Sequence, residues 1–95
     1  MTDADVPAMF ARIPFNDHLG IEVTEAEDGH AEAGLEMREE LSSNPNSMLA
    51  HGGVTYALAD TAGGAAAVSV VEQVTPTVDM RIDYLQPAKI GRAHV

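Results

Sequence analysis

The stretch from Gly52 to Val71 constrains the fold most, because about twenty consecutive residues carry a single charge, that of Asp60. This composition predicts one long helix. A helix without a charged face is expected to be buried on all sides. The remaining chain must therefore supply a sheet that wraps around it.

Alternating apolar and polar residues predict strands on both sides of this helix. Two runs with a period of two, residues 19–24 and 31–38, precede it, and Asp28-Gly29 between them suits a tight hairpin turn. After the helix, residues 74–85 alternate again and predict a strand, and residues 92–95 resemble the start of another. The first two runs are thus expected to form a β-hairpin with one exposed face.

The rest of the chain is short and undivided. Residues 6–13 have the apolar spacing of a short helix that Pro14 ends, and residues 41–50 have the Ser, Asn and Pro content of a loop. No repeat or linker interrupts residues 1–95, which we interpret as a single domain. Three strands and the start of a fourth cover the helix poorly, so we expect either a truncated chain or a neighbouring subunit that completes the sheet.

Composition excludes several kinds of protein. Fifteen Asp and Glu against five Lys and Arg give a net charge of −10, which disfavours nucleic acid and anionic membrane surfaces as partners. The same acidity fits either adaptation to high salt or an ordinary solvated surface. Without cysteine, there is no disulfide, zinc-thiolate site or thiol nucleophile. Residues 1–10 do not resemble a secretory signal, and the longest uncharged apolar run, residues 61–71, is too short to span a bilayer, so a cytoplasmic location is expected.

Asp60 is the strongest candidate for a catalytic residue. Burying an ionised carboxylate costs several kcal/mol unless it is paired, and no Lys or Arg lies between Arg38 and Arg81. The helical period places Asp60 on one face with small or aromatic neighbours, and we take three of them as candidate substrate contacts: Gly53, Tyr56 and Gly64.

The second candidate feature is His51-Gly52-Gly53 at the start of the helix. Unpaired amides and the positive end of the helix dipole can bind an anion or a developing oxyanion. A plain glycine-rich helix start with a solvated histidine is the alternative. Because eight residues of helix separate Gly52 from Asp60 by about 12 Å, both can act on one carbonyl only if they come from different chains across a two-fold axis.

These residues resemble the hotdog-fold acyl-CoA thioesterases of the PaaI type. The resemblance runs from about Leu19 to Gly91 and is most specific in four motifs: His51-Gly52-Gly53-Val54, residues 58–63, residues 78–84 and Pro87-Ala88-Lys89. It implies an α+β fold in which an antiparallel sheet wraps around one central helix, assembled as a homodimer or homotetramer. Members usually continue well beyond the equivalent of Gly91, so the last strands are expected to be missing here.

The resemblance also implies roles for individual residues. Asp60 matches the catalytic carboxylate, as general base or nucleophile, and Gly52 the residue whose amide polarises the thioester carbonyl. His51 matches the histidine that orders this turn. Thr77 matches a hydroxyl that helps hold the water, although it could equally be an ordinary strand residue.

The family's asparagine, six residues before the histidine, is replaced by Pro45, and a shift of one residue would let Asn44 take its place. No cofactor is implied. The four histidines, His18, His30, His51 and His94, are too scattered in the sequence to suggest a metal site.

Three functions remain open at this point. The first is hydrolysis of an acyl-CoA to CoA and a free acid. The second is a non-catalytic module that binds acyl-CoA or has a structural role, and the third, less favoured, is a hotdog dehydratase. The residues near Asp60 permit an aromatic or a medium-chain acyl group.

Overall fold

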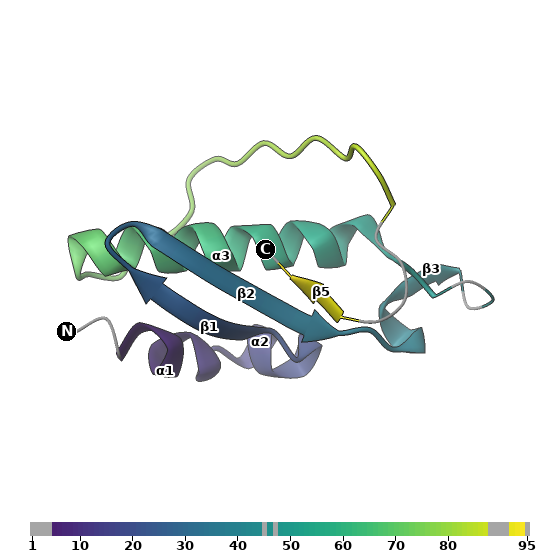
Figure 1. Ribbon diagram of the computed structural model, residues 1–95, viewed down its shortest axis with the longest axis horizontal. Coiled ribbons are helices and arrows are strands. Elements are labelled where there is room, and N and C mark those ends of the chain that lie inside the picture. The colour runs from purple at the N-terminus through teal and green to yellow at the C-terminus, as the bar shows by residue number, and fades with distance from the viewer. Residues whose placement is uncertain (1–4, 45, 47, 88–91, 95) are drawn as a thin grey trace.

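The computed structural model describes residues 5–44, 46, 48–87 and 92–94. In chain order, the elements are α1 (Asp5–Ala11), α2 (Pro14–Leu19), β1 (Glu22–Glu27), β2 (His30–Glu36), the 3-10 helix η1 (Glu39–Leu41), β3 (Ser42–Asn44), β4 (Leu49–Ala50), α3 (Gly52–Val71) and β5 (Arg92–His94). Over these residues, β1, β2 and β5 form an antiparallel sheet in that order, and β3 pairs with β4. Figure 1 shows the sheet lying across α3, with α1 and α2 beside β1. The predicted α+β architecture is confirmed.

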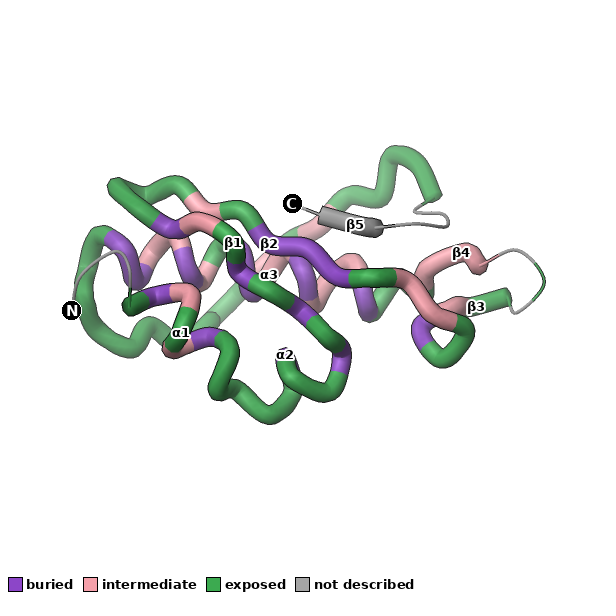
Figure 2. Tube along the Cα trace, turned by 60° about the horizontal axis from the view of Figure 1, so that its bottom comes forward, coloured by how far each residue is buried: buried purple, intermediate pink, exposed green. Residues whose placement is uncertain are grey.

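Helix α3 has the bounds that the sequence predicts. It begins after His51, whose backbone is extended, and ends at Glu72, which adopts a left-handed conformation with φ of 61°. Its sheet-facing side is buried: Val54, Leu58, Thr61, Ala62, Ala65, Val68 and Ser69. The expectation of burial on all sides is wrong for the single chain, because the described sheet covers only one side of the helix (Figure 2).

The predicted hairpin is confirmed, with its turn at Asp28-Gly29. Both residues have positive φ, 51° and 84°, as a two-residue turn between right-twisted strands requires. The amide of Gly29 donates a hydrogen bond of 2.9 Å to Ser69 Oγ, which ties the turn to α3. The register of β1 against β2 shifts between Val23 and Glu25, so a β-bulge interrupts the pairing of the two strands at this point.

The segment around Pro14 differs from the prediction. Helix α1 ends at Ala11, before Pro14 is reached. Pro14 instead opens α2, because its fixed φ and missing N–H suit the first position of a helix. Gly20, with φ of 78°, ends α2, and Arg38 donates hydrogen bonds to the carbonyls of His18 and Leu19 there. The strand therefore begins at Glu22 rather than at Leu19. The predicted loop over residues 41–50 likewise contains the short pair β3 and β4.

The strand expected over residues 74–85 is not formed. This segment runs along α3 without regular structure, as the arch above the helix in Figure 1, and the side chain of Val78 is 98% exposed. A strand is stable only when its backbone groups pair with a neighbour. No described strand lies beside this segment, so Val74 and Val78 are exposed, while Met80 and Ile82 are only half-buried.

By length and composition alone, α3 could cross a membrane, since the mean hydropathy of its most apolar window is 1.3. The core helix of a folded domain meets the same criteria. Here the side of α3 that faces the sheet packs against β1 and β2, which is the arrangement of a core helix.

We expect Leu58→Ala to lower the free energy of unfolding by about 2–5 kcal/mol, because it empties a packed core position. Leu58 is 2% exposed and faces the sheet. Chemical denaturation monitored by circular dichroism measures the change.

The matched control is Leu85→Ala, which deletes the same atoms from a side chain that is 90% exposed. Its effect should stay within about 0.5 kcal/mol. Equal losses for the two variants would contradict the burial pattern described here.

Candidate functional site

Asp60 and Thr77 meet across the gap between α3 and the 74–85 segment. The Thr77 hydroxyl donates a hydrogen bond of 2.6 Å to Asp60 Oδ1. Asp60 is half-buried, and no described Lys or Arg side chain forms an ion pair with it. The carboxylate is therefore oriented by a neutral donor and keeps its other oxygen for another partner.

Two hollows of about 330 Å³ each adjoin Asp60. The first, here called the N-terminal hollow, lies between α1, α2 and α3, and Phe10, Phe15 and Val68 form part of its apolar wall. The second hollow lies between α3 and residues 75–80 and reaches Asp79 and Met80. Asp60 and Thr77 line both, so this polar pair stands where the two hollows meet.

The start of α3 is ordered by its own histidine. His51 Nδ1 accepts a hydrogen bond of 2.8 Å from the Gly53 amide, so the side chain caps the helix. A Cβ atom at residue 53 would lie 3.1 Å from Nδ1, which explains glycine at that position. The Gly52 amide has no hydrogen-bond acceptor among the described residues, as is usual for the first position of a helix.

Three side-chain hydrogen bonds hold the 74–85 segment against α3. Besides the bond from Thr77 to Asp60, the Tyr56 hydroxyl donates to the Met80 carbonyl at 2.9 Å, and the Tyr84 hydroxyl donates to the Gly52 carbonyl at 2.8 Å. The segment thus connects the carboxylate with the start of the helix, although it forms no strand.

The structure brings some predicted site residues together and leaves others apart. Asp60 contacts Thr77, Gly64 lines both hollows, and His51 contacts Gly53. Gly52 and Asp60 lie on one continuous helix, so the distance of about 12 Å between them holds within one chain.

Asn44 and Tyr56 have other contacts. The Asn44 side chain accepts a hydrogen bond of 2.9 Å from the Asn46 amide within its own loop. Tyr56 lines neither hollow and binds Met80 instead. Pro45 lies outside the described residues. The roles of Asn44 and Tyr56 in a site stay predictions.

Sequence reasoning missed the contribution of the N-terminal helices to this site. Asn16 is buried, donates to the Phe10 carbonyl at 3.3 Å and accepts from the Thr61 hydroxyl at 3.2 Å, which joins α2 to α3. It also lines the N-terminal hollow together with Phe10 and Phe15. The apolar periodicity around Phe10 indicates a helix but not which side of α3 that helix covers.

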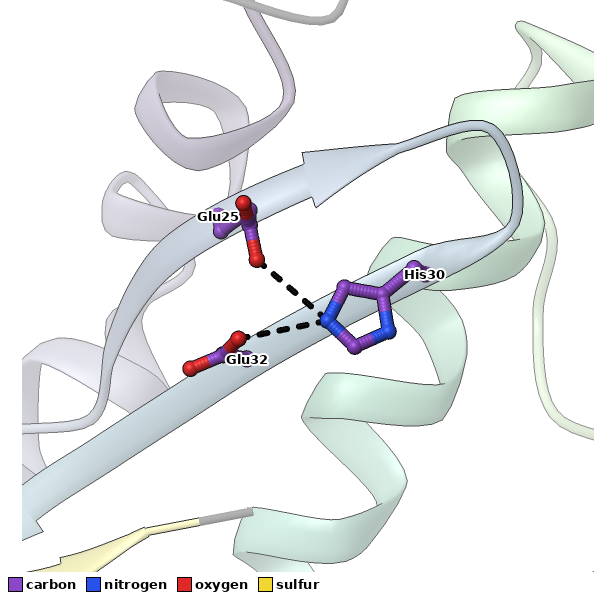
Figure 3. A group of neighbouring side chains, drawn as sticks. All are labelled: Glu25, His30 and Glu32. Atoms are coloured by element: carbon purple, nitrogen blue, oxygen red, sulfur yellow. Dashed lines mark hydrogen bonds and ion pairs between the residues drawn. The ribbon is translucent and has the colours of Figure 1, made fainter.

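A second polar group lies on the exposed face of the hairpin, where Glu25, His30 and Glu32 converge (Figure 3). His30 Nε2 lies 3.3 Å from Glu25 Oε2 and 3.2 Å from Glu32 Oε2. These atoms are of the types that bind Zn²⁺. The three side chains are about half exposed, and a histidine shared between two carboxylates is an ordinary surface ion-pair network.

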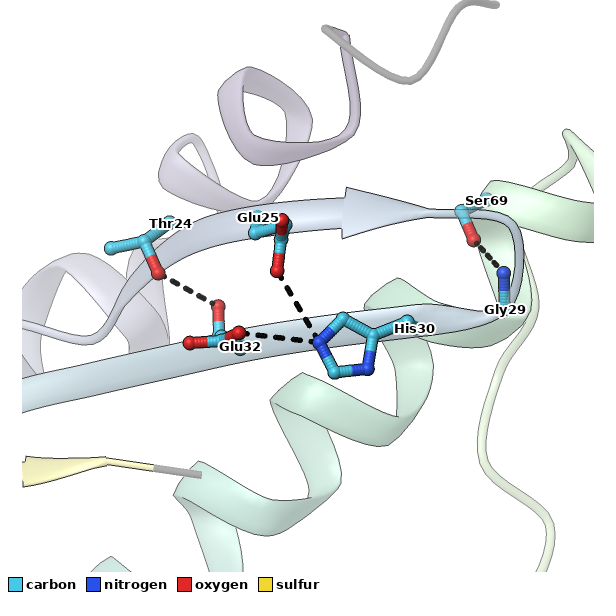
Figure 4. A network of polar contacts seen from close by, with 6 residues as sticks. All are labelled: Thr24, Glu25, Gly29, His30, Glu32 and Ser69. Atoms are coloured by element: carbon cyan, nitrogen blue, oxygen red, sulfur yellow. Dashed lines mark hydrogen bonds and ion pairs between the residues drawn. The ribbon is translucent and has the colours of Figure 1, made fainter.

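The pairing of these three residues follows from the turn. With Asp28-Gly29 as a two-residue loop, Glu27 pairs with His30 and Glu25 with Glu32. Figure 4 shows the group beside the turn that Ser69 holds against α3. The sequence therefore contained the signal for this group, because the spacing to the turn sets which side chains meet.

Glu25, His30 and Glu32 influence one another's pKa values. The hydrogen bond with Glu32 raises the pKa of His30 above 6.5, and the charge of Glu25 adds to this. The hydrogen bond with Glu32 and the repulsion from its charge also raise the pKa of the Glu25 carboxyl, while His30 opposes the shift. The protonated histidine therefore stabilises the fold where His30 is charged and the two glutamates are ionised, and this contribution is lost as the pH rises through the raised pKa of His30.

We expect Glu32→Gln to lower the pKa of His30, because the substitution removes both the hydrogen-bonding carboxylate and its charge. NMR titration of the His30 ring protons measures the change. Glu39→Gln removes the same charge from η1, away from the hairpin, and should leave this titration unchanged. A pKa of His30 that is the same in the Glu32→Gln variant would rule out the group as described.

Comparison with known proteins places the chain in a family. The sequence model of the thioesterase superfamily matches residues 49–95. The X-ray structure of a protein from that superfamily aligns with a TM-score of 0.87 and 35% identity, over 97% of this chain and 70% of that one. The structure of a mutant of the phenylacetic acid degradation protein PaaI from Thermus thermophilus aligns with a TM-score of 0.68 and 33% identity, over 85% of this chain and 68% of that one.

A Halobacterium salinarum protein that carries an esterase name is 33% identical over 97 residues, which cover 92% of this chain. The chain spans 64% of that relative's length. The expected hotdog fold, with an antiparallel sheet on one long helix, is confirmed by these structural neighbours. The chain belongs to the thioesterase superfamily.

Proposed function

We propose that this protein hydrolyses acyl-CoA thioesters, with Asp60 as the catalytic carboxylate. The observation that carries the proposal is the hydrogen bond from Thr77 to Asp60 at the junction of two hollows. A half-buried carboxylate that is oriented by a hydroxyl and unpaired with any described cation suits a general base. Membership of the thioesterase superfamily and the esterase name of one relative support a thioester as the bond that is cleaved.

The chemistry needs no group other than side chains, an amide and water. Water attacks the thioester carbonyl as Asp60 accepts its proton, and the C–O bond forms. The tetrahedral oxyanion is stabilised by the Gly52 amide at the positive end of α3. The C–S bond then breaks, and the CoA thiolate leaves with the proton that Asp60 returns. Thr77 keeps the carboxylate directed toward the water throughout.

Two subunits are needed for this arrangement. Within one chain, Gly52 and Asp60 are about 12 Å apart, too far to act on the same carbonyl. The face of α3 around Asp60 is formed by small residues that are half-exposed in the single chain, including Ala59 and Ala67. A homodimer with two-fold symmetry would cover this face and bring the Gly52 amide of one subunit to the Asp60 of the other. Pairing of such dimers would give a homotetramer.

We expect Asp60→Asn to lower kcat about 10²- to 10⁴-fold, because it removes the general base while keeping the shape of the side chain. Release of CoA thiol from acyl-CoAs measures the rate, and the protein adds no background because it has no cysteine. Asp83→Asn makes the same chemical change in a residue paired with Arg81 at the surface and should leave the rate unchanged.

Full activity in the Asp60→Asn variant would exclude Asp60 as the base. Tight binding of acyl-CoA without turnover by the unmodified protein would favour the non-catalytic module instead. A hydrated product with the thioester intact would favour the dehydratase.

A second variant tests the shared site. Gly52→Pro removes the amide donor at the first position of α3, where proline is well tolerated. The extended backbone of His51, with φ of −60° and ψ of 139°, is the conformation that a residue before proline prefers. We expect kcat to fall about 10²- to 10³-fold while the melting temperature is kept.

Co-expression of the Gly52→Pro and Asp60→Asn chains should restore part of the activity. In a mixed dimer, one site combines the intact Asp60 of one chain with the intact Gly52 amide of the other. Native mass spectrometry of the same sample counts the mixed species. If mixed dimers form and stay inactive, the two groups do not cooperate across subunits.

A further inference from the structure

We propose that the acyl group of the substrate lies in the N-terminal hollow, and that Phe10 and Gly64 limit its size so that compact, uncharged, apolar acyl groups are preferred. This inference rests on the proposed function, because it uses Asp60 as the position of the thioester carbonyl. It goes beyond that function by stating on which side of Asp60 the acyl group binds and which residues determine the acyl specificity.

The walls of the N-terminal hollow suit an apolar guest. They come from three parts of the chain that only the fold brings together: α1 and α2 with Phe10 and Phe15, the side of α3 with Gly64 and Val68, and the 74–85 segment. Phe15 is 58% exposed although it is aromatic and stands at the hollow. An exposed aromatic side chain at the edge of an apolar cavity is typical of a ligand site.

The polar groups of the hollow lie where the thioester would be. Asp60 and Thr77 line it and are hydrogen-bonded to each other, and Asn16 and Thr61 are paired with each other at another point of the wall. Asp60 is the one ionisable side chain among the described residues that line this hollow. An acyl group with its own carboxylate would meet that negative charge in an apolar setting, which disfavours it.

The volume of the N-terminal hollow suits an acyl group rather than the whole acyl-CoA. About 330 Å³ is at the lower end of the range of small-ligand sites, roughly 300–1,000 Å³. The hollow therefore accommodates a phenylacyl or short aliphatic group, while the CoA portion has to extend past Asp60 toward solvent.

Phe10 and Gly64 lie beside each other in the wall of this hollow. A Cβ atom at residue 64 would lie 3.6 Å from both Cε2 and Cζ of Phe10, which is ordinary van der Waals contact. Gly64→Ala therefore fits without a clash, and alanine favours a helix more than glycine does. The added methyl group would remove room from the hollow without harming the fold, which separates the effect on binding from an effect on stability.

The test compares phenylacetyl-, hexanoyl-, acetyl-, succinyl- and palmitoyl-CoA as substrates. For the unmodified protein, we expect kcat/KM for phenylacetyl- and hexanoyl-CoA to exceed that for succinyl- and palmitoyl-CoA at least about tenfold. Gly64→Ala should lower kcat/KM for phenylacetyl- and hexanoyl-CoA about tenfold while sparing acetyl-CoA, because one methyl group in an apolar pocket discriminates by that order. Phe10→Leu, which keeps an apolar side chain in the core, should shift the preference toward longer acyl groups.

Gly63→Ala tests the alternative that the acyl group lies in the second hollow. Gly63 lines the second hollow but not the N-terminal one, and a Cβ atom there would meet nothing within 4 Å. If Gly63→Ala changes the acyl preference as much as Gly64→Ala does, the acyl group lies in the second hollow and the inference is wrong. Unchanged preferences in both Gly64→Ala and Phe10→Leu, or a preference for succinyl-CoA, would also overturn it.

Calorimetric binding to the Asp60→Asn chain makes the inference testable without turnover. The affinities of the acyl-CoAs for the Asp60→Asn chain should follow the order expected for kcat/KM. The Asp60→Asn, Gly64→Ala double variant should lose affinity for phenylacetyl- and hexanoyl-CoA. Both results would support binding of the acyl group in the N-terminal hollow, even if the protein binds acyl-CoA without turnover. If turnover depends on Asp60 but shows no preference among acyl groups, the proposed function stands and only this inference is wrong.

Discussion

The packing of one side of α3 against β1 and β2 is the contact on which the rest of the structure depends. Val68 and Leu35 are among the most deeply buried side chains, and Ser69 fixes the hairpin turn to the helix through Gly29. Because the sheet occupies this side of the helix, the small residues on the other side are left half-exposed, and Asp60 lies among them. The core thus decides where a charged residue can be tolerated in an otherwise apolar helix.

The site is built from segments that have little regular structure of their own. The 74–85 segment is exposed and strandless, yet three side-chain hydrogen bonds hold it along α3 and bring Thr77 to Asp60. On the other side, Asn16 joins the N-terminal helices to Thr61 of α3. Side-chain hydrogen bonds to the central helix, rather than backbone pairing, therefore position both walls around the carboxylate.

The face of α3 that carries Asp60 combines two properties that are seldom found together. It is apolar enough to be covered by another protein surface, and it contains a carboxylate that a covered surface would have to accommodate. Thr77 supplies a neutral hydrogen-bond donor, which orients one carboxylate oxygen and adds no charge of its own. A general base has to accept a proton, and a carboxylate that no described cation binds suits that role.

The sequence by itself determined the elements whose signals are local. The uncharged run predicts α3, Asp28-Gly29 fixes the hairpin and its register, and the isolation of Asp60 marks it as a candidate before any fold is known. It gave a wrong start for the first strand, because the helix that Pro14 opens overrides a short alternation. Only the tertiary structure decided that residues 74–85 have no partner strand in the described part of the chain, and that Phe10 and Asn16 border the space beside Asp60. Both outcomes depend on which segments become neighbours in space, and periodicity along one segment carries no information about its neighbours.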